Sequence, residues 1–137
     1  MSDAVDLVSN AVRRRLLRDG ADALRETEWH LLRVSHLLNA AERGTLQRLL
    51  ADTPIAELLD VADGLDAIGS PNAGQRLRTA TEHLAVANDP GNGLIRAGTV
   101  ASSAGLLGEQ LAAMRGEIER RLVEYAVRHR ERPVAAG

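Results

Sequence analysis

The sequence contains no cysteine, phenylalanine or lysine, and Trp29 and Tyr125 are its only aromatic residues. Without cysteine the chain forms no disulfide and offers no thiolate to a metal ion. Because aromatic rings are so scarce, the core has to be built from Leu, Ala, Val and Ile. Arginine supplies all 17 positive charges, and 19 acidic residues nearly balance them. That balance argues against a protein whose affinity comes from neutralising many phosphates, so direct nucleic-acid binding is not expected.

Long apolar runs are missing too, since no segment approaches the roughly 20 uninterrupted apolar residues of a membrane span. The first residues, Met1 to Asp6, are acidic where a secretory signal is basic and then apolar. These features predict a cytoplasmic protein with no membrane partner. A length of 137 residues suits one domain around a single core. We expect this domain to span residues 1–132, with residues 133–137 as a frayed tail.

Helical periodicity runs through most of the chain, and no stretch of β-branched alternation predicts a strand. Glycine and proline signals divide this pattern into separate helices. We expect helices over residues 3–18, 22–41, 46–50, 54–68 and 71–87, followed by a long C-terminal helix that ends at residue 132. The predicted fold class is therefore all-α, a single compact bundle of five to six helices.

Two segments near the middle of the chain carry other signals. Residues 88–93 contain a proline and two glycines and form the strongest predicted loop. Residues 94–107 are rich in Gly, Ala, Ser and Thr, so they form either a loosely wound helix or a connector. Beyond them an apolar stripe recurs every three or four positions: Leu107, Leu111, Met114, Ile118, Leu122 and Tyr125. This stripe serves either as intramolecular core or as the self-association face of a homodimer.

The helix predicted over residues 22–41 offers the best candidate for a metal site. Glu26 and His30 are four residues apart and share a face, whereas His36 lies about 120° further round. His83 would complete a site if its helix met this one, as happens in metal-binding bundles. Trp29 and His36 also resemble the DinB-like metal-binding family, which implies a metal-dependent enzyme as an alternative. Since no glycine-flanked nucleophile or phosphate-cradling loop is present, we expect neither a cofactor nor enzymatic activity.

Charged residues gather on two of the predicted helices. Glu57, Asp60, Asp63 and Asp66 are spaced by three and form an acidic stripe opposite the apolar side of the helix at residues 54–68. Solvation explains such a stripe, but its carboxylates would also steer the approach of a basic protein. The last turn of the first helix holds Arg13, Arg14, Arg15 and Arg18. Cations there complement the negative end of the helix dipole, so these arginines need no partner.

Two short motifs and the C-terminal helix resemble a small helical bacterial family, largely of unknown function, that includes DNA-mimic proteins. Glu42-Arg43-Gly44-Thr45 is similar to that family's turn into a short helix, and Ala67-Ile68-Gly69-Ser70 to a later helix end. The segment Leu122 to His129 resembles its closing helix, with a Tyr followed by a His. The resemblance covers about residues 24–130.

This resemblance implies a non-enzymatic protein that binds another protein in bacterial regulation, toxin neutralisation or phage conflict. It adds Glu42 and Arg43 to the acidic stripe as expected partner-binding residues. DNA mimicry presents carboxylates at phosphate-like spacing, so with 17 arginines in the chain it requires the arginines to lie on another face.

Overall fold

A computed structural model describes residues 3–87 and 93–130. These residues form α1 (Asp3–Asp19), the 3-10 helix η1 (Ala21–Ala23), α2 (Glu26–Arg43), α3 (Leu46–Asp52), α4 (Ile55–Ala67), α5 (Pro71–Ala87) and α6 (Gly93–Arg130). Within these two ranges there is no strand. The predicted all-α bundle with a long C-terminal helix is therefore confirmed.

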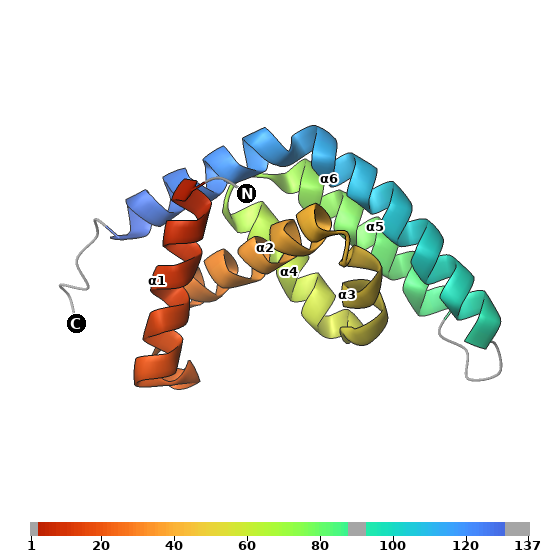
Figure 1. Cartoon of the computed structure of the whole chain (residues 1–137), viewed down its shortest axis with the longest axis horizontal. Coiled ribbons are helices and arrows are strands. Elements are labelled where there is room, and N and C mark those ends of the chain that lie inside the picture. Colours follow the sequence, from red (N-terminus) through yellow and green to blue (C-terminus); the bar gives the residue numbers. More distant parts are fainter. Residues whose placement is uncertain (1–2, 88–92, 131–137) are drawn as a thin grey trace.

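The long helix α6 organises the bundle, as Figure 1 shows. With 38 residues it extends about 57 Å at 1.5 Å per residue, and it arches over the other helices. Helix α5 packs along the first part of α6 and against α4, while α2 packs against both α4 and α6. Helix α1 is set apart, crossing the bundle near the end of α6 with contacts to α2, η1 and α6.

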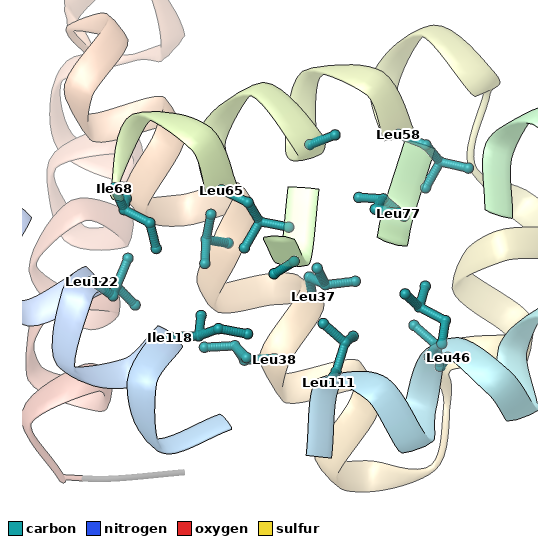
Figure 2. Close-up of a cluster of buried hydrophobic side chains, with 14 of the residues drawn as sticks. Leu37, Leu38, Leu46, Leu58, Leu65, Ile68, Leu77, Leu111, Ile118 and Leu122 are labelled. Carbon is teal, nitrogen blue, oxygen red and sulfur yellow. The ribbon is translucent and has the colours of Figure 1, made fainter. Parts of the chain in front are cut away.

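The core is made of aliphatic side chains, as the composition requires, and Figure 2 shows its centre. Leucines and isoleucine from α2, α4, α5 and α6 meet there, among them Leu37, Leu38, Leu65, Leu77, Leu111 and Ile118. The apolar stripe of α6 belongs to this core, because Met114 is half-buried and its other five members are buried. The stripe is thus intramolecular and unavailable as a homodimer face.

Helix boundaries follow the glycine and proline signals closely. Gly44 adopts a left-handed conformation with φ 73° and ends α2, its N–H donating to the Ala40 carbonyl. Gly69, with φ 96°, follows α4, and α5 begins at Pro71 as predicted. Helix α4 begins at Ile55, one residue later than predicted, because Pro54 is its N-cap residue.

Helix α2 begins four residues later than the sequence predicts. Gly20 takes φ 86°, and a 3-10 turn occupies Ala21–Ala23. Leu24 is then extended and buried, so the chain changes direction before α2 starts at Glu26. Burial of Leu24 in the core explains why a continuous helix from residue 22 does not form.

Residues 94–107, which the sequence predicts as either a loosely wound helix or a connector, are a regular part of α6. Val100, Ser103, Ala104 and Leu107 are buried, and the small side chains allow α5 to pack closely against this stretch. Arg96 donates from Nη2 to the Ala51 carbonyl at 3.0 Å, which ties this part of α6 to α3. Of the loop predicted at residues 88–93, Gly93 is instead the first residue of α6. The rest of that loop, the predicted helix end at 131–132 and the tail at 133–137 lie outside the described residues.

Candidate binding cleft

An open cleft of about 590 Å³ lies where α1 crosses the beginning of α2 and the end of α6. Its volume falls within the range of ligand-binding clefts in proteins. Apolar side chains from all three helices line it, including Leu7, Val12, Leu31 and Val127. Four arginines line it as well: Arg14, Arg15, Arg18 and Arg25.

Helix α1 carries two rows of side chains on this side, and residues of both rows line the cleft. Val5 and Val12 are buried and Leu16 packs beside them, which holds α1 on the bundle. A neighbouring row carries Leu7, Ala11, Arg14 and Arg18 at spacings of three and four, and all four line the cleft. Leu7 is 67% exposed, although leucine at a well-packed helix position is normally buried. The row is therefore an unpartnered surface of mixed apolar and cationic character.

Glu28 is the carboxylate that organises the cleft, and only 9% of its side chain is exposed. Its Oε1 accepts hydrogen bonds from the backbone N–H of Arg25 and from Arg25 Nε, each at 3.2 Å. The same oxygen lies 3.3 Å from Arg15 Nη1. Since Arg15 Nη2 also donates to the Ala23 carbonyl at 2.9 Å, this network fastens α1 to η1 and to the start of α2.

Cationic groups outnumber anionic ones in the cleft, because its lining holds four arginines and a single carboxylate. Glu28 is shared by Arg15 and Arg25, so neither of these arginines is free. Arg18 pairs with Asp19 at 3.0 Å, and this hydrogen bond lowers the pKa of the Asp19 carboxyl. Arg14 is exposed and has no ion pair with any residue of the described part. Arg14 is thus the cation best placed to meet an incoming anion, and Arg18, although paired with Asp19, is exposed to solvent beside it.

Two buried polar atoms of cleft residues have no hydrogen-bond partner among residues 3–87 and 93–130. They are Arg15 Nε and Thr27 Oγ1. Buried polar groups in native proteins are nearly always paired, so each unpaired one asks for an explanation. At the end of α6, His129 also lines the cleft, and its ring lies 4.2 Å from that of Tyr125, centroid to centroid.

The acidic stripe of α4 is divided by the structure. Asp63 and Asp66 both accept from Arg78 Nη2 on α5, Asp63 at 2.9 Å. The two carboxylates raise the pKa of Arg78 above its ordinary value. Glu57 and Asp60 are exposed and make no ion pair with the part of the chain that is described. Only half of the predicted stripe is therefore available to a partner. Glu42 and Arg43 are exposed on a different element, the last turn of α2.

The residues of the alternative metal site are not assembled. Glu26 Oε1 lies 3.7 Å from His30 Nε2, but His36 is exposed further along α2. His83 lines a small hollow between α5 and α6. Among residues 5–87 and 96–129 no three His, Asp or Glu side chains are grouped to hold a metal ion. The condition under which His83 would complete a site, that its helix meets α2 there, is not met, because His83 lies between α5 and α6.

Sequence reasoning missed the cleft for a physical reason. The helix dipole alone explains the arginines at the end of α1, so they did not indicate a site. No residue within four positions of Arg15 indicates that Glu28 lies against it. A signal was nevertheless present in the second row of α1, where Leu7 precedes Arg14 and Arg18 at helical spacing outside the valine face. A helix with two such rows needs a second neighbour to cover the extra one.

Searches against protein-family models, curated proteins and solved structures find no match for this chain. The fold and the cleft define it as an all-α bundle that carries an open surface of mixed apolar and cationic side chains. In the described ranges, no helix is both long and apolar enough to cross a membrane.

Proposed function

We propose that this chain is a non-enzymatic cytoplasmic binding module that captures another protein in the cleft between α1, α2 and α6. The observation that carries the proposal is the exposed row of α1, with Leu7 67% exposed beside Arg14 and Arg18 on a concave surface. On the opposite wall Val127 is 48% exposed. Apolar groups and arginines gathered in one cleft are typical of protein interfaces, where arginine is enriched.

Binding suits this cleft better than catalysis. A general base needs a carboxylate or imidazole free to take a proton. Glu28, the one carboxylate of the lining, is already held by two guanidinium groups and a backbone N–H. Guanidinium groups stay protonated at neutral pH and therefore cannot act as a general base. The arginines, which make up most of the charged lining, therefore offer contacts and charge rather than proton transfer.

The family resemblance supports the biological setting of this proposal, namely bacterial regulation, toxin neutralisation or phage conflict. The acidic stripe, which the spacing of its carboxylates predicts, is the other candidate contact surface. Because Arg78 already holds Asp63 and Asp66, the stripe presents only two carboxylates, Glu57 and Asp60, that make no ion pair with the described residues. The cleft is the better contact surface, since it is concave and its exposed row is apolar as well as charged.

Site-specific photo-crosslinking in a native bacterial lysate tests the proposal. A photoreactive amino acid replaces Leu7 in the cleft or, as a control, Leu59, which is exposed on α4. We expect a discrete protein adduct from position 7 that disappears with Arg14→Glu/Arg18→Glu and persists with Glu57→Arg/Asp60→Arg. An adduct formed only from position 59, and lost with the α4 pair, would assign the interface to the acidic stripe instead. Absence of any adduct from position 7 would contradict the proposal.

A further inference from the structure

We infer that the cleft recognises an acidic amphipathic helix of the partner, with an apolar side chain against Leu7 and Val127 and carboxylates on Arg14 and Arg18. This inference rests on the proposed function and adds the chemistry of the ligand. It follows from the charge of the cleft, from the spacing of its exposed groups and from the kinds of backbone that can be bound there.

The charge of the cleft selects an acidic partner. Four arginines and one carboxylate leave the lining with an excess of positive charge. Glu28 is enclosed by Arg15 and Arg25, so an incoming segment does not meet its charge directly. Arg14 and Arg18 project from the outer part of α1 and are exposed. Complementary charge speeds association and selects against basic segments, which this cleft would repel.

The apolar part of the cleft requires an amphipathic partner rather than a merely acidic one. Leu7 on α1 and Val127 on α6 both line it, and both are substantially exposed. Behind them, Val12 and Leu31 form an apolar floor. Covering these groups removes apolar surface from water, which is the main favourable contribution to most protein association. A highly charged, purely polar segment would leave that contribution unused.

The spacing of the exposed groups matches a helix. Leu7, Arg14 and Arg18 follow one another at intervals of seven and four residues, so their Cα atoms are about 10 Å and about 6 Å apart along α1. A helix lying beside α1 presents side chains at the same intervals. One apolar residue with carboxylates seven and eleven positions away would meet all three groups at once. This is the helix-in-groove mode of recognition, with anchors at helical spacing.

The backbone of the bundle also favours a helical ligand. An extended peptide gains affinity by adding hydrogen bonds to a strand edge, and residues 3–87 and 93–130 contain no strand. A helix satisfies its own backbone groups and contributes only side chains. The unpaired Arg15 Nε and Thr27 Oγ1 are side-chain groups of the cleft that a polar residue of such a helix could satisfy.

Fluorescence anisotropy with three labelled synthetic peptides and the full chain tests the inference. The peptides have about 18 residues, enough to form a helix on binding. The first carries a leucine face flanked by glutamates, the second replaces every glutamate with lysine, and the third replaces the leucines with serine. We expect saturable binding of the first peptide only, with affinity at least about tenfold higher than for the other two.

Variants of the chain then locate the binding. We expect Arg14→Glu/Arg18→Glu and Leu7→Ser each to lower the affinity for the first peptide at least about tenfold. A matched charge reversal on the exposed Arg48 of α3 should change its affinity by less than about twofold. All these positions are exposed, and circular dichroism verifies that each variant folds.

Three outcomes would overturn the inference. They are equal binding of the acidic and basic peptides, equal weakening by Arg48→Glu and by the cleft pair, and tighter binding of a labelled oligonucleotide than of the acidic peptide. If position 7 crosslinks to a partner while no peptide binds, the proposed function holds and the acidic helix is wrong. If the crosslink and the peptide both fail, the proposed function is wrong as well.

Discussion

Substitution of Glu28 by alanine tests whether the buried carboxylate holds the cleft together. The change removes an acceptor that the Arg25 backbone N–H, Arg25 Nε and Arg15 Nη1 share. A hydrogen bond to a charged group contributes about 1.5–3 kcal/mol, and loss of a helix cap costs about 1 kcal/mol. Both arginine side chains are more than a third exposed (35% and 39%) and regain water, so the smaller values apply. We expect Glu28→Ala to lower the free energy of unfolding by about 2–3 kcal/mol.

Urea unfolding followed by circular dichroism measures this change, with Glu26→Ala as the matched control. Glu26 lies on the same turn of α2, but its side chain is 86% exposed and its ion-pair partner is His30 at 3.7 Å. The control should therefore cost less than about 0.5 kcal/mol. Glu28→Gln keeps one acceptor oxygen, so its loss of unfolding free energy should lie between those of Glu28→Ala and Glu26→Ala. A Glu28→Ala effect no larger than that of Glu26→Ala would refute the reasoning that this network fastens α1 to the bundle.

Two further predictions concern packing and pH. Gly116→Ala should stabilise the chain by up to about 1 kcal/mol in thermal unfolding, because a Cβ there meets nothing within 4 Å and alanine favours helix. Gly74→Ala should destabilise it by about 1 kcal/mol, because its Cβ would meet Asp66 Oδ1 and the Ala62 carbonyl oxygen, while Arg78 holds the same carboxylate through Oδ2; equal effects at the two glycines would contradict this packing. Burial of the Tyr125 ring, and then the charge of Glu26, raises the pKa of the phenol above 10.0. The unfolded chain then loses that proton first, so the free energy of unfolding should fall as the pH rises from about 10 through the folded-state pKa. Tyr125→Phe should abolish this fall in urea unfolding across that range.

Helix ends and the composition of the core were predictable because their signals are local. Gly44 and Gly69 take positive φ directly after helices, a conformation that other residues rarely adopt. Pro71 begins α5 where a fixed φ and a missing N–H cost nothing. The predicted start of α2 at residue 22 was wrong, because there the local helical pattern competes with burial. Leu24 enters the core in an extended conformation, and α2 begins only after it.

The candidate site was harder to predict because it depends on pairs of residues far apart in the chain. Glu57 and Asp60 remain an exposed acidic surface, as helical periodicity predicts, and their role in binding a partner stays a prediction. Arg78 engages Asp63 and Asp66 from 15 and 12 residues away, which depends on how α4 and α5 pack. The sequence left open whether the apolar stripe of α6 is core or a homodimer face for the same reason, since the stripe does not reveal which surface will cover it.

By itself, the sequence determined that the chain is helical, where most helices end and that aliphatic residues form its core, because these properties depend on interactions within about four residues. Only the tertiary structure decided that α6 continues through its small-residue segment, since packing against α5 and α3 outweighs weak propensity there. It also decided that Arg15 meets Glu28 and that α1 leaves a cleft beside α2 and α6. These outcomes depend on how the helices cross, which side-chain packing over the whole chain determines.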